Sequence, residues 1–393
     1  MKYRLEDICS FRKEKVAVSS LTLKNYISTE NMLPNKAGIT KATSLPKCNT
    51  TQKFECGDVL VSNIRPYFKK IWKAKFNGGC SNDVLVFSAK EGFDTEFLYY
   101  VLSDDSFFEY SMATSKGTKM PRGDKKSIMN YEVPCFDINI QIKTASILKS
   151  IDDKIELNNK INNNLEQQAQ AIFKSWFVDF EPFGGVQPSE MQFIPLQELC
   201  KVVTKGTTPT TLGKSFTSSG INFIKAESIL YNHSIDSSKF AFIDEETNAL
   251  LKRSVIKAND IIFTIAGTLG RFAIVDNSVL PANTNQAVAI IRPDETKVTP
   301  AYLYSFFIGN WHNEYYSKRI QQAVQANLSL TTIKSLPIAV LNNTTMSNYD
   351  KLVSPLFVLM KNNEEENRRL SKLRDTLLPK LMSGELDVSN IEL

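Results

Sequence analysis

The sequence predicts a mixed α/β (α+β) protein in which two globular domains of similar fold are separated by two long helices that form an antiparallel coiled coil. Two observations lead to this prediction. Segments of the first half of the 393-residue chain recur in the same order in the second half, and each half ends in a long helical pattern. Hydrophobic residues make up 42% of the chain and charged residues 23%, which is typical of globular proteins.

The internal repeat is clearest in one apolar and one aromatic segment. The matching pairs are GDVLVS at residues 57–62 with NDIIFT at 259–264, and FLYY at 97–100 with YLYS at 302–305. Matching segments keep their order and nearly their spacing in both halves. We therefore expect a pseudo-twofold repeat, in which one globular domain occupies residues 1–140 and a linker with the second domain occupies residues 181–345.

Short strands are expected in both globular domains. Four apolar runs are rich in β-branched residues and are bounded by Gly, Asn or Asp, which are typical strand ends. These runs are residues 59–61, 84–87, 261–263 and 288–291. Because each run is short and fully apolar, it predicts a strand that is buried within a mixed α/β domain.

Two long helices are expected, a central one at residues 141–180 and a C-terminal one at 346–393. Between Pro134 and Pro182 the chain contains neither Gly nor Pro, and apolar residues recur at a seven-residue period. A stripe of residues with the same seven-residue period, which we call the seam, recurs in the C-terminal segment. This repeated seam predicts that the two helices pair with each other.

Four asparagines occupy equivalent seam positions, and we interpret them as residues that set the register of the helix pair. They are Asn158 and Asn162 in the central helix and Asn363 and Asn367 in the C-terminal helix. A buried Asn is destabilising unless it meets another amide, so matched Asn layers favour helices that face each other. The alternative, in which each helix packs only on its own domain, would not require these layers to recur.

No pattern typical of an active site, a metal site or a disulfide occurs in the sequence. The two histidines, His233 and His312, are far apart, and the six cysteines form no C-x-x-C pair. Residues 208–215 resemble a phosphate-binding loop, but Thr208 replaces the first glycine that such a loop requires. Scattered thiols, together with the absence of a signal peptide or an 18-residue apolar run, predict a cytoplasmic protein without a membrane partner.

Features typical of nucleic-acid binding are more frequent. The net charge of +5 is modest, but residues 67–76 interleave four lysines with four aromatic residues, and residues 116–123 form a basic loop. The corresponding places in the second half are residues 268–271 and 318–327. A solvated surface over buried aromatics would explain any one cluster, whereas recurrence in both halves favours binding.

Several motifs make the chain similar to the specificity subunits of type I restriction-modification systems. They are IRPYFKK at residues 64–70, GCS at 79–81, GTTP at 206–209, AGTLGR at 266–271, FKSWFVDF at 173–180 and LLPKLMSGEL at 377–386. The resemblance covers essentially the whole chain, in the right order and with the right duplication.

The resemblance implies that the chain recognises DNA without catalysing a reaction. Its globular domains would be target recognition domains, each of which reads one half of a bipartite, asymmetric site in double-stranded DNA. The implied partners are two methyltransferase subunits and the restriction and translocase subunits. S-adenosylmethionine, ATP and Mg would be bound by those partners, so we expect no cofactor on this chain.

The length of the helices supports a split site independently. A helix of about 36 residues is roughly 54 Å long, whereas one turn of DNA is about 34 Å. Two domains held apart by such a spacer cannot read adjacent bases. Because the two domains differ in sequence, their half-sites should also differ, and the target should not be palindromic.

Twelve residues are the candidates for DNA contact. Phosphate contacts are expected for Lys69, Lys70, Lys73 and Lys119. Base contacts are expected for Arg65, Arg122 and Arg271 with guanine, and for Asn285, Gln286 and Asn327 with adenine. The loop residues Thr207 and Thr208 complete the set. By its position in the repeat Arg65 corresponds to Gly267, so equivalent roles are not expected for these two.

Three other functions remain open on the sequence alone. A stand-alone DNA-binding decoy or regulator would form no modification complex. A fused methyltransferase would need a cofactor loop, which the sequence does not show. A coiled-coil scaffold that does not bind DNA would leave two large duplicated domains without a role.

Overall fold

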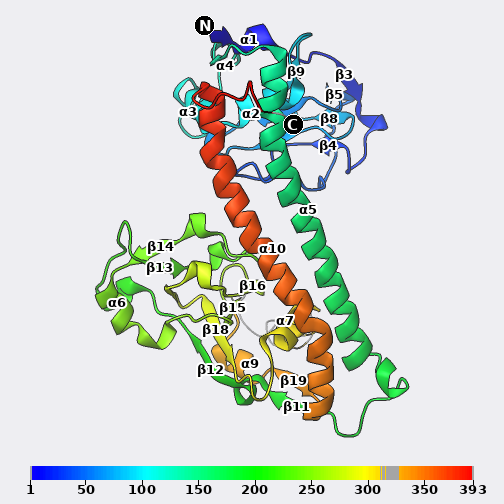
Figure 1. The fold of residues 1–393 in the computed structure, drawn as a ribbon, viewed down its shortest axis with the longest axis vertical. Coiled ribbons are helices and arrows are strands. Elements are labelled where there is room, and N and C mark those ends of the chain that lie inside the picture. The colour runs from blue at the N-terminus through cyan, green and yellow to red at the C-terminus, as the bar shows by residue number, and fades with distance from the viewer. Residues whose placement is uncertain (1, 310, 312–314, 316–326, 392–393) are drawn as a thin grey trace. The chain divides into compact units, whose positions relative to one another are not determined.

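The computed structural model describes residues 2–309, 311, 315 and 327–391 (Figure 1). It confirms a mixed α/β fold with two similar globular domains and two long paired helices. The chain divides into two compact units, residues 1–156 with 368–393 and residues 157–367. The division runs through both long helices, so each unit contains one globular domain and a part of each helix. The segment boundaries given above stay a prediction.

The first unit contains three sheets, whose strand orders are β1-β10, β2-β9-β6-β7 and β3-β5-β8-β4. Its strands are β1 (Lys2–Arg4), β2 (Cys9–Phe11), β3 (Lys15–Ala17), β4 (Tyr26–Ile27), β5 (Thr50–Phe54), β6 (Val59–Ser62), β7 (Ile71–Lys73), β8 (Gly78–Cys80), β9 (Val84–Ala89) and β10 (Glu132–Pro134). Its short helices are α1 (Leu5–Ile8), α2 (Thr95–Ser103), α3 (Asp105–Ala113) and α4 (Lys125–Met129).

The second unit repeats the two-stranded sheet and the first four-stranded sheet as β11-β19 and β12-β18-β15-β16, whereas its third sheet has three strands, β14-β13-β17, instead of four. Its strands are β11 (Gln192–Pro195), β12 (Cys200–Lys205), β13 (Ile221–Ile224), β14 (Ala241–Ile243), β15 (Ile261–Thr264), β16 (Phe272–Ile274), β17 (Ala282–Thr284), β18 (Val288–Pro293) and β19 (Pro337–Val340). Its short helices are α6 (Glu245–Leu250), α7 (Pro300–Ile308) and α9 (Leu330–Lys334). All four apolar runs expected as strands lie in β6, β9, β15 and β18.

The most clearly repeated motif forms the same turn in both units. Gly57 and Asn259 have positive φ angles of 94° and 67°, a region that suits glycine and tolerates asparagine. The aspartate that follows turns back and accepts a backbone hydrogen bond: Asp58 from Glu55 N at 2.8 Å, and Asp260 from Lys257 N at 2.7 Å. The matching GD and ND pairs therefore build the turns that lead into the central strands β6 and β15.

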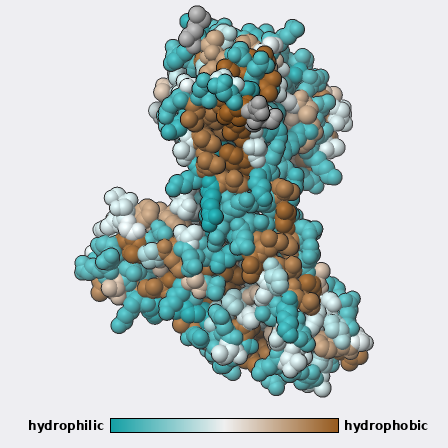
Figure 2. All heavy atoms as spheres, viewed as in Figure 1, coloured by the Kyte–Doolittle hydropathy of each residue, from teal (hydrophilic) through white to brown (hydrophobic). Residues whose placement is uncertain are grey.

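Both long helices contribute to the hydrophobic core of each unit. Helix α5 spans Ile138–Phe177 and helix α10 spans Asn343–Ser383. In the first unit, Leu148 of α5 and Leu381 of α10 are buried in the core. In the second unit, Phe173 of α5 and Val353 of α10 have the same role. On the face of the first unit that Figure 2 shows, hydrophobic residues gather beside these two helices.

Helix α10 ends earlier than the segment expected to form it. The helix stops at Ser383 because Gly384 adopts a φ of 76°, the left-handed conformation that commonly terminates a helix. The chain then folds back, and Val388 is buried in the core of the first unit. None of the helices that the structure describes combines the length and the hydropathy that a membrane span requires.

Candidate nucleic-acid interface

In the first unit, two loops are joined by backbone hydrogen bonds into one basic surface. The β6–β7 loop carries Arg65, whose amide donates to Pro121 O at 2.8 Å. Lys116 and Arg122 close the second loop through two backbone hydrogen bonds of 2.9 and 3.0 Å. Gly123 allows this contact because a Cβ atom there would lie 2.8 Å from Asn63 Oδ1. The structure thus brings together Arg65 and Arg122, which are far apart in the sequence.

Several cations on this surface already have partners within the unit. Lys69 Nζ lies 2.8 Å from Asp105, Arg122 Nη2 lies 3.2 Å from Asp83, and Lys73 pairs with Glu96. Lys70 Nζ donates to the carbonyl of Thr29 at 2.6 Å, and burial lowers the pKa of Lys70. Among the residues that the structure describes, Lys119 has no ion-pair partner, so its charge is fully available to a ligand.

The aromatic residues of segment 67–76 divide between core and surface. Trp72 is only 8% exposed and packs against Phe54 and Phe76, so it belongs to the core. Tyr67 and Phe68 are exposed, and their ring centroids lie 4.6 Å apart. The interleaved pattern therefore offers only Tyr67 and Phe68 to a ligand.

In the second unit, the loop after β12 lies against the segment that follows β17. Gly206 permits this approach because a Cβ atom there would lie 1.9 Å from Thr284 O. The Thr208 hydroxyl donates to Gln286 Oε1, and Arg253 Nη2 donates to Thr207 Oγ1 at 3.3 Å. The structure thus gathers three predicted residues and adds Arg253, which the sequence patterns did not single out.

The remaining polar candidates of this unit have different surroundings. The side-chain oxygen of Asn285 accepts a hydrogen bond from Ala287 N at 3.2 Å, so it helps to shape its own turn. Asn327 is exposed. The rest of the basic segment 318–327 lies outside the described residues.

Arg271 is held at the end of the β15–β16 hairpin by contacts on three sides. Its amide donates to the Thr264 hydroxyl at 2.9 Å, and its Nη1 donates to Ile229 O at 3.1 Å. Its guanidinium carbon lies 3.7 Å from the ring centroid of Tyr231. Tyr231 lies in an irregular turn without periodicity, and for that reason the sequence patterns gave no signal for it.

The four seam asparagines form two amide pairs in the second unit. Asn158 Nδ2 donates to Asn367 Oδ1 at 3.0 Å, and Asn363 Nδ2 donates to Asn162 Oδ1 at 2.7 Å. Residue numbers therefore rise along α5 while they fall along α10, as antiparallel pairing requires. Asn158 also donates to Glu366 at 2.7 Å and has no exposed surface.

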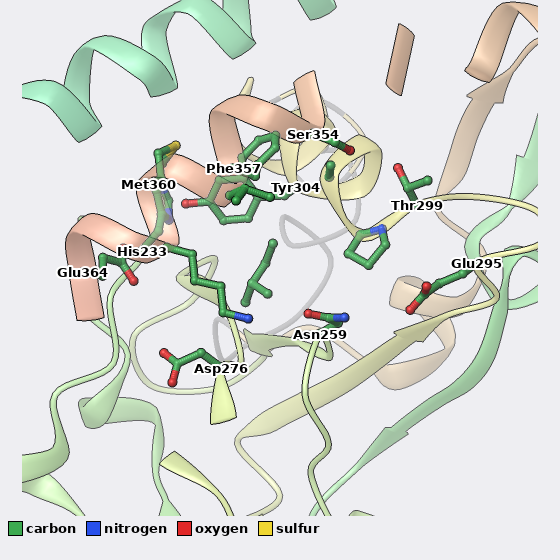
Figure 3. Close-up of a pocket in the computed structure, with 15 residues that line it drawn as sticks. His233, Asn259, Asp276, Glu295, Thr299, Tyr304, Ser354, Phe357, Met360 and Glu364 are labelled. Carbon is green, nitrogen blue, oxygen red and sulfur yellow. The ribbon is translucent and has the colours of Figure 1, made fainter. Parts of the chain in front are cut away.

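A cavity of about 270 Å³ lies in the second unit between the globular domain and α10 (Figure 3). Its walls include Asp276, Glu295 and Glu364, together with the aromatic rings of Tyr304 and Phe357. Over the described ranges, no group of three or more His, Cys, Asp or Glu side chains has the arrangement of a metal site. Burial raises the pKa of the Cys9 and Cys80 thiols to about 12, so neither is poised as a nucleophile.

Comparison with known proteins identifies one family. The sequence model of the type I restriction modification DNA specificity domain matches residues 1–167 and 188–340. The specificity subunit of the type I restriction enzyme MjaIX from Methanocaldococcus jannaschii is 27% identical over 321 residues, which cover 77% of this chain and 71% of that subunit. The specificity subunit of HindI from Haemophilus influenzae is 25% identical over 98% of this chain and 99% of that subunit.

A solved structure shares the fold. The S subunit of a type I restriction-modification system from M. genitalium superimposes with a TM-score of 0.58 and 18% sequence identity, over 99% of this chain and 96% of that one.

Proposed function

Because the chain belongs to the specificity subunits of type I restriction-modification systems, we propose that it reads a bipartite, asymmetric DNA site, one half with each globular domain. The observation that carries the proposal is the repeated fold. The corresponding hairpins β6–β7 and β15–β16 carry Arg65 and Arg271 at different positions of their loops, and within the described parts of the chain neither arginine has a carboxylate partner. Different loops surround the two arginines, which supports two different half-sites.

The proposal assigns separate roles to the two kinds of candidate residue. Lys69, Lys70, Lys73 and Lys119 contact phosphates and hold the first domain on the duplex, which gives affinity without sequence information. The arginines and amides read base edges in the major groove, where guanine offers two acceptors and adenine offers one donor and one acceptor. Affinity and specificity then depend on different side chains and can be tested separately.

The proposal also makes the chain a scaffold. Helix α5 has 40 residues, which corresponds to about 60 Å, nearly two turns of DNA. Two methyltransferase subunits and the restriction subunits assemble on the chain, and the catalytic residues belong to them. S-adenosylmethionine, ATP and Mg are bound by these partners, and this chain determines which DNA sequence the complex recognises.

The test is to map methylated adenine across a genome after co-expression of the chain with its methyltransferase subunit. A parallel strain carries a chain whose residues 1–140 come from a relative. We expect a split, non-palindromic motif in which only one half changes after the exchange. A single undivided motif, or a change in both halves, would contradict the assignment of one reader to each domain.

Complex formation is measured in the same preparations. A stable complex that methylates no DNA, although the methyltransferase subunit is active with another specificity subunit, would contradict DNA reading by this chain. DNA binding to a specific sequence without any complex would instead support the stand-alone decoy.

A further inference from the structure

The side chain of Tyr231 is 80% exposed, yet it packs closely against a cation. Its ring covers the guanidinium of Arg271, whose central carbon lies 3.7 Å from the ring centroid. A phenol ring with this exposure gains little from burial, so the hydrophobic effect does not explain its position. The contact with Arg271 does, because an aromatic face attracts a guanidinium that lies over it.

The turn that carries Tyr231 is fastened to the core of the second unit. Leu230 N donates to Ser234 O at 3.0 Å, and Asp236 N donates to Ser228 O at 2.8 Å. Below the turn, the His233 ring stacks on Phe272 with a centroid distance of 4.1 Å. Phe272 follows Arg271 directly in the chain, so the stacking of His233 on Phe272 connects the turn that carries Tyr231 to the strand that carries Arg271. Tyr231 is therefore held near Arg271 without a ligand.

The guanidinium of Arg271 is oriented but not neutralised. Its Nη1 donates to Ile229 O at 3.1 Å, and its Nε is buried without a hydrogen-bond partner. No carboxylate of the described residues lies within ion-pair distance of it, whereas Arg292 of the same unit is paired with Asp260. Because Nε is buried, a ligand has to meet this guanidinium at its terminal nitrogens. A charged edge held in one orientation is suited to an acceptor supplied by a ligand.

The corresponding hairpin of the first unit also carries an arginine with a buried, unpaired Nε, Arg65. Tyr67 and Phe68 are exposed next to it in the chain. An arginine without a carboxylate partner in the described residues thus occurs in the loop of the corresponding hairpin in both units, although at different positions of the loop, and exposed aromatic side chains lie in its neighbourhood. The local backbone differs, because Arg65 itself has a φ of 51°.

We propose that Tyr231 is a positioning residue for base recognition: by stacking on Arg271, it holds the guanidinium edge in the orientation that pairs with one guanine of the second half-site. The inference rests on the proposed function, and it adds a residue that touches no base itself but determines how strictly that guanine is required. Arg271 then reads the base, while the turn of residues 229–235 acts as its support.

The test uses the complex of the full chain with its methyltransferase subunits and a library of duplexes randomised across both half-sites. The variants are Arg271→Ala, Tyr231→Ala, Tyr231→Phe and the control Phe193→Ala, which removes another exposed aromatic side chain of the same unit. The readout is the relative methylation rate of each sequence. Loss of a bidentate arginine contact corresponds to about a 5- to 150-fold loss of guanine preference, and loss of an exposed cation–π contact to about two- to fivefold.

We expect Arg271→Ala and Tyr231→Ala to lose preference at the same base pair, the second by the smaller factor. Tyr231→Phe should retain the preference because phenylalanine keeps the stacking face, and Phe193→Ala should leave the motif unchanged. The first half-site should be read normally throughout.

Three results would overturn the inference. Tyr231→Ala could keep the full preference, change a different base pair, or slow methylation of all sequences equally, as the loss of a phosphate contact would. Each of these leaves the proposed function intact as long as the wild-type complex yields a split motif. If the wild-type complex yields none, the proposed function fails and this inference fails with it.

Discussion

Arg292 holds Asp260 through two hydrogen bonds of 2.7 Å, one from Nε and one from Nη2. Asp260 is completely buried, so this pair neutralises a carboxylate that water cannot reach. In the first unit, Arg12 holds the equivalent Asp58 through bonds of 2.5 and 3.0 Å. Arg12 follows strand β2, whereas Arg292 lies on β18. The two units therefore pair the equivalent aspartates, Asp58 and Asp260, with arginines from different segments of the fold.

Replacing Arg292 should destabilise the second unit strongly. Arg292→Leu leaves Asp260 buried without its cationic partner, and breaking a buried pair in this way costs about 3–5 kcal/mol. The free energy of unfolding, measured with urea at pH 7, is the readout. Lys201→Ala is the matched control, because Lys201 is 60% exposed and lies 4.0 Å from Asp294; its loss should cost less than about 1 kcal/mol. Equal free energies of unfolding for the two variants would contradict a stabilising role of the buried Arg292–Asp260 pair.

The asparagine pair between α5 and α10 should be strongly coupled. Asn158→Ala removes the amide that donates to Asn367 Oδ1 at 3.0 Å, which should cost about 1–3 kcal/mol because a partly buried acceptor loses its donor. Asn158→Leu combined with Asn367→Leu replaces both polar groups, so it should cost less than the sum of the single replacements Asn158→Leu and Asn367→Leu. The free energies of unfolding of the two single variants and the double variant give this coupling. Additive losses would show that the pair does not act as one unit.

The stability of the second unit should depend on pH through His233. Burial lowers the pKa of its imidazole below the ordinary value of 6.5. The unfolded chain therefore binds the proton more readily, and the stability present above about pH 6.5 is lost as the pH falls below it. Glu166, whose Oε1 lies 3.7 Å from His233 Nε2, has the opposite trend, because burial raises its pKa from 4.5 and favours the folded state in acid.

The variant His233→Gln isolates the contribution of the imidazole. It loses the stacking on Phe272 at every pH, so the informative quantity is the change in unfolding free energy between pH 7.5 and 5.5. That change should be smaller in the variant than in the wild type. An unchanged pH profile would mean that the folded protein binds the His233 proton as readily as the unfolded chain does.

Periodic features of the sequence predicted most of the fold, and the interface was the part they described least well. Strands β6 and β15 and both long helices follow from apolar runs and a seven-residue period, because core packing imposes these patterns. Tyr231 and Arg253 lie in irregular loops, where position depends on contacts between distant segments. Arg374 follows the seam residue Asn367 by one seven-residue period and therefore also lies on the seam, but it is charged, and the structure explains it through an ion pair of 2.9 Å with Asp152.

Lys119 should contribute more to the salt dependence of DNA binding than Lys73 does. Each phosphate contact adds about 0.9 to the slope of log K against log salt concentration, because a cation displaces counterions from the duplex. Lys119 lies on an exposed loop, and no ion pair of Lys119 occurs in the described part of the chain. Lys73 is paired with Glu96, so a phosphate contact would have to replace this ion pair, and fewer counterions would be released from the DNA.

The measurement is the dissociation constant of the complex with its methyltransferase subunits for a duplex that carries the mapped motif, at a series of salt concentrations. Lys119→Ala should lower the slope by about 0.9, and Lys73→Ala should lower it clearly less. Neither variant should change the preferred motif, since phosphates carry no base identity. Equal slopes for Lys119→Ala and the wild type would remove Lys119 from the interface, whereas a full loss with Lys73→Ala would show that its ion pair opens on DNA.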